Sequence, residues 1–165
     1  MTSPIILHRP RVFRETPSVR FHDISVEGSN GLDLVEHHGR AVSPPNTRHG
    51  LKQWYFHKHQ TDNNRVIKGQ RLFELFYSKW SNPHWFVFLD ETSGALEIPP
   101  HCYHRSMSCA SGSILLNHAV RDDEYDERKE FNPQVVWKAA LMKPCYHGIL
   151  PHEADHFIHT GELPR

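Results

Sequence analysis

No stretch of this sequence approaches the roughly 18 consecutive apolar residues that a membrane-spanning helix requires. An excess of charge is also absent, because 19 Lys and Arg residues balance 19 Asp and Glu residues, for a formal net charge of +0. Proteins that bind nucleic acid or anionic membranes usually carry clustered basic charge. We therefore expect a soluble protein that has neither nucleic acid nor a membrane as its partner.

Cysteine is scarce as well. The three cysteines, Cys102, Cys109 and Cys145, are odd in number and form no CxxC motif. This pattern argues against the disulfide framework of a small secreted domain. The first ten residues show no basic segment followed by a long apolar run, so they do not predict a secretory signal peptide. Together these absences favour a cytoplasmic setting.

Histidine, by contrast, is abundant, with 15 residues in a chain of 165. Its side chain titrates near neutral pH and is the commonest metal ligand, so clusters of it point to chemistry. A chain of this length suits one domain with a sizeable core. We therefore expect residues 1–165 to form a single domain.

Short strand-like runs separated by turn residues occupy most of the chain. We expect strands at residues 19–26, 32–35, 54–59, 65–67, 71–77, 85–89, 95–98 and 114–118, with a turn at 68–70. Strands at such regular spacing favour an antiparallel sandwich or barrel, and we predict an all-β jelly-roll barrel. Its core is expected at about 19–133, followed by a C-terminal extension at 134–165. Short helices are expected at 122–129, 133–142 and 151–159.

Two histidine boxes stand out. The first contains His57 and His59, followed by Asp62, and the second, at residues 99–104, ends in His104. Residues two apart on a strand face the same side of a sheet, so we expect His57 and His59 to point the same way. If Asp62 and His104 come from neighbouring strands, these groups converge inside the barrel. Such a cluster either binds a divalent metal or transfers a proton.

With these boxes the sequence resembles the cupin superfamily, and within it the dTDP-4-dehydrorhamnose 3,5-epimerases and, next, the sugar 3,4-ketoisomerases. Residues 57–69 resemble the first cupin motif, residues 99–104 the second, and residues 115–133 the end of the barrel. The resemblance runs roughly from residue 35 to residue 133. It implies a homodimeric jelly roll that needs no cofactor and moves a proton next to the keto group of a dTDP- or UDP-linked 4-keto-6-deoxy sugar. It also implies a role in surface polysaccharide assembly.

The resemblance assigns roles to individual residues. His57 abstracts the proton by analogy with the epimerases, or His59 does so by analogy with the ketoisomerases. His104 positions the sugar or relays the proton. The substrate-binding residues are expected to be Arg71, Arg105, Gln60 and Tyr103, with the arginines as partners of the pyrophosphate.

The chain departs from the epimerase pattern at two positions. Asp62 stands where the epimerases have a lysine that steadies the enolate oxygen. Residues 115–118 contain no tyrosine, although the epimerases have an acidic tyrosine near this point. Tyr55, Tyr103 and Tyr125 are the available substitutes.

Two other interpretations stay open for the same residues. A site of His57, His59, Asp62 and His104 suits a divalent Fe, Mn, Ni or Zn ion, so the chain is alternatively a metal-dependent cupin enzyme. The same side chains could also fill a non-catalytic cupin module that binds a small molecule. Residues 152–156 match the HExxH signature of zinc proteases, but we interpret this as a chance match on a terminal tail.

Overall fold

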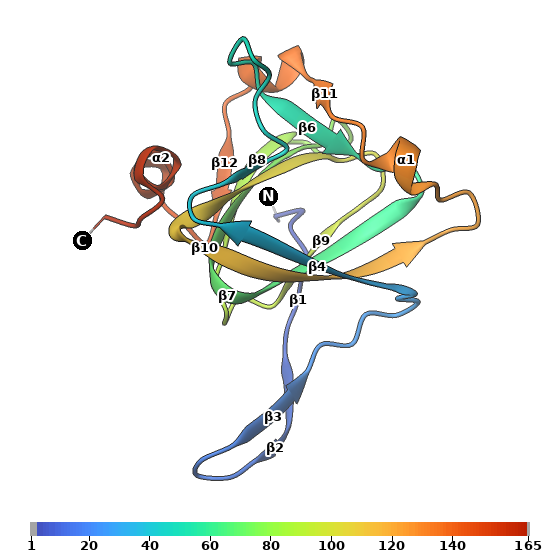
Figure 1. Ribbon diagram of the computed structural model, residues 1–165, viewed down its shortest axis with the longest axis vertical. Helices are drawn as coiled ribbons and strands as arrows, with labels where there is room; N and C mark the ends of the chain where they lie inside the picture. Colours follow the sequence, from blue (N-terminus) through green and yellow to red (C-terminus); the bar gives the residue numbers. More distant parts are fainter. Residues whose placement is uncertain (1–2, 165) are drawn as a thin grey trace.

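The computed structural model describes residues 3–164 and shows two facing sheets that share two long, bent strands (Figure 1). These strands are β7 (Gln60–Phe76) and β10 (Tyr103–Arg121), which pair with each other antiparallel along most of their length. Because each passes from one sheet into the other, they close the sheets into a barrel. The predicted jelly roll is confirmed.

The first sheet is built around the start of β7 and the end of β10. β7 pairs there with β9 (Ala95–Ile98), and β10 pairs with β4 (Gly31–His38). β1 (Leu7–His8), which the sequence did not predict, extends this sheet beyond β9. β4 alternates between partly buried and exposed residues, and its outward-facing Leu32 and Leu34 are exposed. One face of β4 therefore packs on the core while the other meets solvent.

The second sheet is built around the other halves of the same strands. The end of β7 pairs with β8 (His84–Leu89), and the start of β10 pairs with β5 (Val42–Ser43) and β6 (Gln53–Phe56). Two strands of the C-terminal part complete it, because β11 (Gln134–Val135) pairs with β6 and β12 (Cys145–His147) pairs with β8. The sheet therefore extends beyond the predicted core at residues 19–133.

Both long strands bend at a glycine. Gly69 and Gly112 have φ angles of +80° and +88°, which side-chain-bearing residues rarely adopt. A Cβ on Gly69 would lie 2.5 Å from the carbonyl oxygen of Gly112, so the close approach needs glycine. The pairing register shifts between Ser108 and Ser113 and again between Ile114 and Leu115, which marks a bulged region around the two glycines, called the bulge below. The turn predicted at residues 68–70 is wrong, because the chain bends within one continuous strand.

The bulge reverses which residues of each strand face the barrel interior. On β7 the inward residues are even-numbered before the bulge, such as Asp62, and odd-numbered after it, such as Arg71. β10 changes in the same way between His104 and Asn117. Side chains from both ends of each strand therefore meet in one interior.

The N-terminal part forms a hairpin outside the barrel. β2 (Arg11–Glu15) and β3 (Arg20–Asp23) pair with each other and project away from the two sheets (Figure 1). The strand predicted at residues 19–26 exists in part, but it belongs to this hairpin and not to the barrel. Phe13 and Phe21 are both exposed on it, with ring centroids 6.2 Å apart.

Helical segments occur close to the predicted places. α1 (Glu127–Glu130) covers only the end of the helix expected at residues 122–129. η1 (Trp137–Leu141) is a short 3₁₀ helix, and α2 (Pro151–Thr160) is the longest helix described. None of the helices within residues 3–164 is long and apolar enough to cross a bilayer.

The C-terminal extension packs on the outer face of the second sheet. Phe157 of α2 meets Phe88 of β8 edge-on, with ring centroids 5.6 Å apart. The HExxH match lies on α2, but Glu153 accepts a hydrogen bond from the backbone N–H of Leu150 and so caps the helix. His152 is exposed, and no group of three metal-ligating side chains forms here among residues 3–164. Glu153 of this motif therefore has a structural role at the start of α2.

Candidate active site

The barrel encloses a cavity of about 220 Å³. Both sheets and the segment after α1 contribute to its wall. The lining residues are Asp33, Val35, Ser43, Tyr55, His57, Gln60, Asp62, Asn64, Arg71, Phe73, His104, Ser106, Leu115, Asn117 and Phe131. Most of these side chains are polar or charged, so the cavity is more polar than the mainly apolar walls of a typical small-molecule site.

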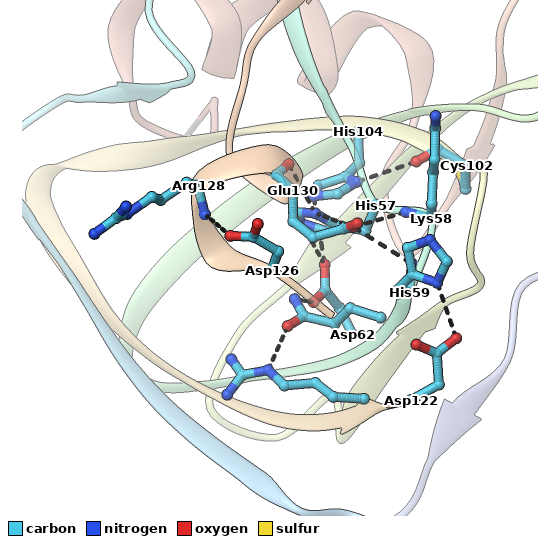
Figure 2. A network of polar contacts seen from close by, with 12 residues as sticks. His57, Lys58, His59, Asp62, Cys102, His104, Asp122, Asp126, Arg128 and Glu130 are labelled. Carbon is cyan, nitrogen blue, oxygen red and sulfur yellow. Dashed lines mark hydrogen bonds and ion pairs between the residues drawn. The ribbon is translucent and has the colours of Figure 1, made fainter. Parts of the chain in front are cut away.

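Asp62, at the start of β7, is only 4% exposed. Its Oδ1 accepts hydrogen bonds from the side-chain amides of Gln60 and Asn117, the latter at 2.9 Å. Its Oδ2 lies 3.6 Å from Nε2 of His57 and 3.4 Å from Nε2 of His104. The two amides thus hold the carboxylate so that its second oxygen faces both imidazoles. Figure 2 shows Asp62 below His57 and His104.

Backbone carbonyls fix the tautomer of both rings. Nδ1 of His57 lies 3.1 Å from the carbonyl oxygen of Glu130, and Nδ1 of His104 lies 3.2 Å from that of Cys102. A carbonyl oxygen can only accept, so each Nδ1 carries the proton and donates. In a neutral ring the lone pair is then on Nε2, the nitrogen that faces Asp62.

Three acceptor atoms therefore converge, and all lie within 4.8 Å of one another: Nε2 of His57, Nε2 of His104 and an oxygen of Asp62. Burial, together with the nearby His57, lowers the pKa of His104 to about 4, although Asp62 acts in the opposite direction. His104 is consequently neutral at neutral pH. Acceptors in this arrangement need a shared cation, which can be a proton on one imidazole or a metal ion.

Glu130, which follows the short helix predicted at residues 122–129, is buried beside this cluster. Its Oε2 accepts hydrogen bonds from the backbone N–H groups of Lys58 and His59, at 2.7 and 3.4 Å. The same oxygen lies 3.6 Å from Nδ1 of His57. The last residue of α1 therefore anchors the loop that carries His57. Nothing in the local sequence separates this glutamate from its exposed neighbours.

Arg71 enters the cavity from beyond the bulge and is 2% exposed. Its Nε donates to Oγ of Ser113 at 3.0 Å, and its Nη2 lies 3.3 Å from the carbonyl oxygen of Val35. Burial lowers the pKa of Arg71 to about 10, and no carboxylate of the described chain offsets that effect. A buried guanidinium without a counter-charge therefore faces the cavity, where it can stabilise an anion.

Aromatic rings flank the histidine pair. Tyr55 stacks on His57 with centroids 6.2 Å apart and planes at 13°, and Phe131 meets the same imidazole at 4.9 Å. Tyr55 is the one of the three candidate tyrosines that lines the cavity. Its hydroxyl is therefore the available phenolic acid.

His59 does not share the cavity with His57, so the expected common face is wrong. β6 ends at Phe56, and the two histidines lie on a loop and not on a strand. Nδ1 of His59 lies 3.0 Å from a carboxylate oxygen of Asp122, on the outer side of the loop (Figure 2). The structure brings together His57, His104 and Asp62.

Two of the predicted substrate-binding residues also point elsewhere. Tyr103 and Arg105 alternate on β10 with the inward His104, so they face the outside of the barrel. Tyr103 packs against Phe56, with ring centroids 4.5 Å apart, and Arg105 donates to Oδ1 of Asn46 at 2.8 Å. The other two, Gln60 and Arg71, line the cavity as expected.

No protein-family model matches the chain, and no curated protein sequence matches it. Solved structures do share its fold. The sugar 3,4-ketoisomerase QdtA from Thermoanaerobacterium thermosaccharolyticum, in complex with TDP, matches with a TM-score of 0.57 and 13% identity over 84% of this chain and 92% of that one. A mutant of QdtA in complex with TDP-4-keto-6-deoxyglucose matches with a TM-score of 0.57 and 14% identity, over 87% and 96% of the two chains.

A third match is the dTDP-4-dehydrorhamnose 3,5-epimerase from Elizabethkingia anophelis NUHP1. Its TM-score is 0.59, with 11% identity over 88% of this chain and 90% of that one. The chain therefore has the RmlC-like cupin jelly-roll fold that the resemblance implied.

Proposed function

We propose that this chain is a sugar-nucleotide epimerase or isomerase that moves a proton next to the keto group of a dTDP- or UDP-linked 4-keto-6-deoxy sugar. The observation that carries the proposal is the convergence of two imidazole Nε2 atoms on one buried carboxylate oxygen. A buried, uncompensated arginine lines the same cavity. The solved structures with this fold, which include TDP and TDP-sugar complexes, support the substrate class.

The chemistry is a reversible proton transfer. Nε2 of His57 takes the proton from the carbon next to the carbonyl, and the C–H electron pair moves into the enolate. Asp62 stabilises the imidazolium that forms, and the guanidinium of Arg71 stabilises the negative enolate oxygen. Return of a proton to the same carbon, from the imidazolium of His57 or from the Tyr55 hydroxyl, completes an epimerisation. A shift of the keto group instead returns the proton to the former carbonyl carbon, while the neighbouring hydroxyl loses its proton to the former carbonyl oxygen. No oxidant or reductant is needed, because the substrate and the product are isomers with the same overall oxidation state.

The size of the cavity supports entry of only part of the substrate into the barrel. At about 220 Å³ it is smaller than the roughly 300–1,000 Å³ typical of whole-ligand pockets. It suits a sugar ring, while the nucleotide remains outside the barrel. We infer that specificity for the nucleotide depends on residues at the mouth of the barrel.

The test is deuterium exchange into TDP-4-keto-6-deoxyglucose in heavy water, followed by NMR. We expect exchange at a carbon next to the keto group, and we expect His57→Asn to slow it by about 10²–10⁴-fold, the usual contribution of a general base. Asp62→Asn and Arg71→Met should each slow it as well. His59→Asn should retain exchange, because that imidazole lies outside the cavity.

His156→Asn is the matched control, since His156 is exposed on α2. Unchanged exchange in the His57→Asn variant would contradict the proposed base. If the nucleotide sugar binds but never exchanges, the chain is instead a non-catalytic binding module.

A metal-dependent cupin enzyme is the second candidate, and the same cluster favours it. His57, Asp62 and His104 form a two-histidine, one-carboxylate set, and each Nδ1 is oriented by a carbonyl as in many metal sites. Such a set fits divalent Fe, Mn, Ni or Zn, which would polarise an oxygen of the substrate. Elemental analysis of protein without a His tag, before and after EDTA, separates the candidates. Undiminished exchange by metal-free protein supports the first, and exchange that depends on metal supports the second.

We further propose that the chain acts as a cytoplasmic homodimer in surface polysaccharide assembly. Three free cysteines are consistent with a reducing compartment. Exposed apolar side chains on the projecting hairpin support self-association.

A further inference from the structure

The two amides that support Asp62 could each be turned in two ways. A side-chain amide presents either its NH₂ group or its oxygen to a neighbour, and only the nitrogen can donate to a carboxylate. For Asn117 the backbone fixes the orientation, because its Oδ1 accepts from the backbone N–H of Asn63 at 2.8 Å. Its Nδ2 is thereby left to donate to Asp62 at 2.9 Å. The amide of Gln60 is oriented by a side chain instead.

That side chain belongs to Arg121, the last residue of β10. Its Nε donates to Oε1 of Gln60 at 2.7 Å. A guanidinium has only donors, so the amide atom that faces it is the oxygen, and the amide nitrogen of Gln60 is left to donate to Asp62. Gln60 is 1% exposed, so bulk water does not compete for this contact. The orientation of one of the two amides on Asp62 therefore depends on Arg121.

Three contacts fix the guanidinium of Arg121 itself. Its Nη2 lies 2.6 Å from Oδ2 of Asp33, and its central carbon lies 4.4 Å from the ring centroid of Tyr125. The guanidinium also lies close to Gly31, where a Cβ would be 2.6 Å from Nη1. The ion pair, the cation–π contact and the space left by the glycine together hold Nε toward Gln60.

Arg121 acts from outside the barrel cavity. Gln60 and Asp62 are among the described residues that line the cavity, whereas Arg121 is not. Its side chain is 22% exposed and lies between the cavity wall and solvent. The guanidinium therefore reaches the reacting groups through Gln60, and not by contact with a sugar inside the barrel.

We propose that Arg121 is a positioning residue, which holds the amide of Gln60 so that its N–H donates to Asp62. This inference rests on the proposed function, in which the carboxylate of Asp62 stabilises the imidazolium of His57. Hydrogen bonds from N–H donors stabilise the charged form of a carboxylate. Without Arg121 the amide of Gln60 can rotate and present its oxygen to Asp62, which replaces a hydrogen bond with repulsion between two oxygens.

The first test needs no substrate. In ¹⁵N-labelled full-length protein, the side-chain amide signals of Gln60 are identified by their loss in the Gln60→Met variant. We expect amide hydrogen exchange at this group to be slow in the wild type, because it donates to a buried carboxylate. Arg121→Met removes the donors, so it should shift these signals and accelerate their hydrogen exchange. Arg128→Met, at an exposed position on α1, is the matched control and should leave them unchanged.

The second test measures deuterium incorporation into TDP-4-keto-6-deoxyglucose. Arg121→Met should lower kcat by about tenfold and leave KM within about twofold, because it weakens a charged hydrogen bond without touching the sugar. Gln60→Met should lower kcat as well. The double variant should be no slower than Gln60→Met alone, since Arg121 acts through Gln60. Arg121→Gln should give the same pattern with a smaller loss, and it replaces Arg121→Met if circular dichroism shows that variant to be unfolded.

Amide signals of Gln60 that are the same in the wild type and in Arg121→Met would overturn the proposal. Losses in kcat that multiply in the double variant would overturn it too, as would a rise in KM at constant kcat, which would make Arg121 a substrate contact. A wild type that never incorporates deuterium into the keto sugar would contradict the proposed function instead. The amide signals of Gln60 would then still show whether Arg121 orients it.

Discussion

A carboxylate at position 62 changes how charge is distributed in the proposed active site. The epimerases that the sequence resembles have a lysine there, which steadies the enolate oxygen. Asp62 cannot do this, because its free oxygen faces His57 and His104. It can stabilise an imidazolium instead. In the proposed mechanism Arg71, which lines the cavity from beyond the bulge, supplies the positive charge that the lysine would provide.

The buried imidazole of His104 makes acid stability testable. Its pKa is lowered to about 4 in the folded protein, mainly by burial, from the ordinary value of 6.5. The unfolded state therefore binds the proton more readily. The free energy of unfolding is unaffected by this group above about pH 6.5, and it decreases as the pH falls from there through about 4. The shift corresponds to about 3 kcal/mol at most. Urea unfolding at pH values across this window measures the slope.

His104→Gln should flatten that slope, because glutamine does not titrate. His37 has a pKa of about 4 as well, lowered by burial and by Arg71, so part of the slope should persist. His156→Gln, at an exposed position on α2, serves as the control and should keep the wild-type slope. An identical slope in the wild type and in His104→Gln would show that protonation of His104 does not destabilise the folded protein.

The loop at residues 57–59 depends on a separate element, α1. Asp126 caps α1 by accepting a hydrogen bond from the backbone N–H of Arg128 at 3.1 Å. The helix thereby presents Glu130 to the loop, whose backbone N–H groups would otherwise be unpaired beside a cavity. The position of His57 is consequently set from a segment about 70 residues further along the chain.

Glu130→Ala should release this loop without unfolding the barrel. The loss of one charged acceptor for two backbone donors is expected to cost about 1–3 kcal/mol locally. Amide hydrogen exchange at Lys58 and His59 should accelerate, while that of the β7 and β10 core should not. Glu127→Ala, an exposed position on the same helix, is the matched control. Protection at Lys58 that survives Glu130→Ala would show that another group holds the loop.

The elements also show what a sequence can predict. The alternation of strands and turns was enough for the jelly roll, because that architecture follows from strand spacing. The inward faces were harder to predict, since the bulge at Gly69 shifts inward positions from even to odd numbers and so brings Arg71 into the cavity. His59 was misplaced because β6 stops at Phe56. Glu130 was missed because its contacts are distant in sequence.

At the scale of the whole molecule, the hairpin of β2 and β3 pairs with no further strand of the described chain, and His22 accepts a hydrogen bond from Arg65 of β7. The hairpin exposes apolar side chains to solvent. An isolated two-stranded hairpin of this kind is only marginally stable in water. The exposed apolar residues on it and on β4 are Val12, Phe13, Val19, Phe21, Leu32 and Leu34. That residues 1–165 form a single domain stays a prediction, and a single cooperative unfolding transition would support it.

We propose that a second copy of the chain covers both surfaces at once. β4 pairs on one edge only, with β10, among the strands described, so its other edge can accept a strand from another chain. We expect the wild type to sediment at about twice the mass of one chain. The double variant Phe13→Ser with Phe21→Ser should sediment as a monomer, because it removes the largest apolar groups of the hairpin. Leu141→Ser, at an 82% exposed position on η1, should remain dimeric. A monomeric wild type would contradict the dimer. A dimer that persists in the double variant but is lost in Leu141→Ser would place the interface elsewhere.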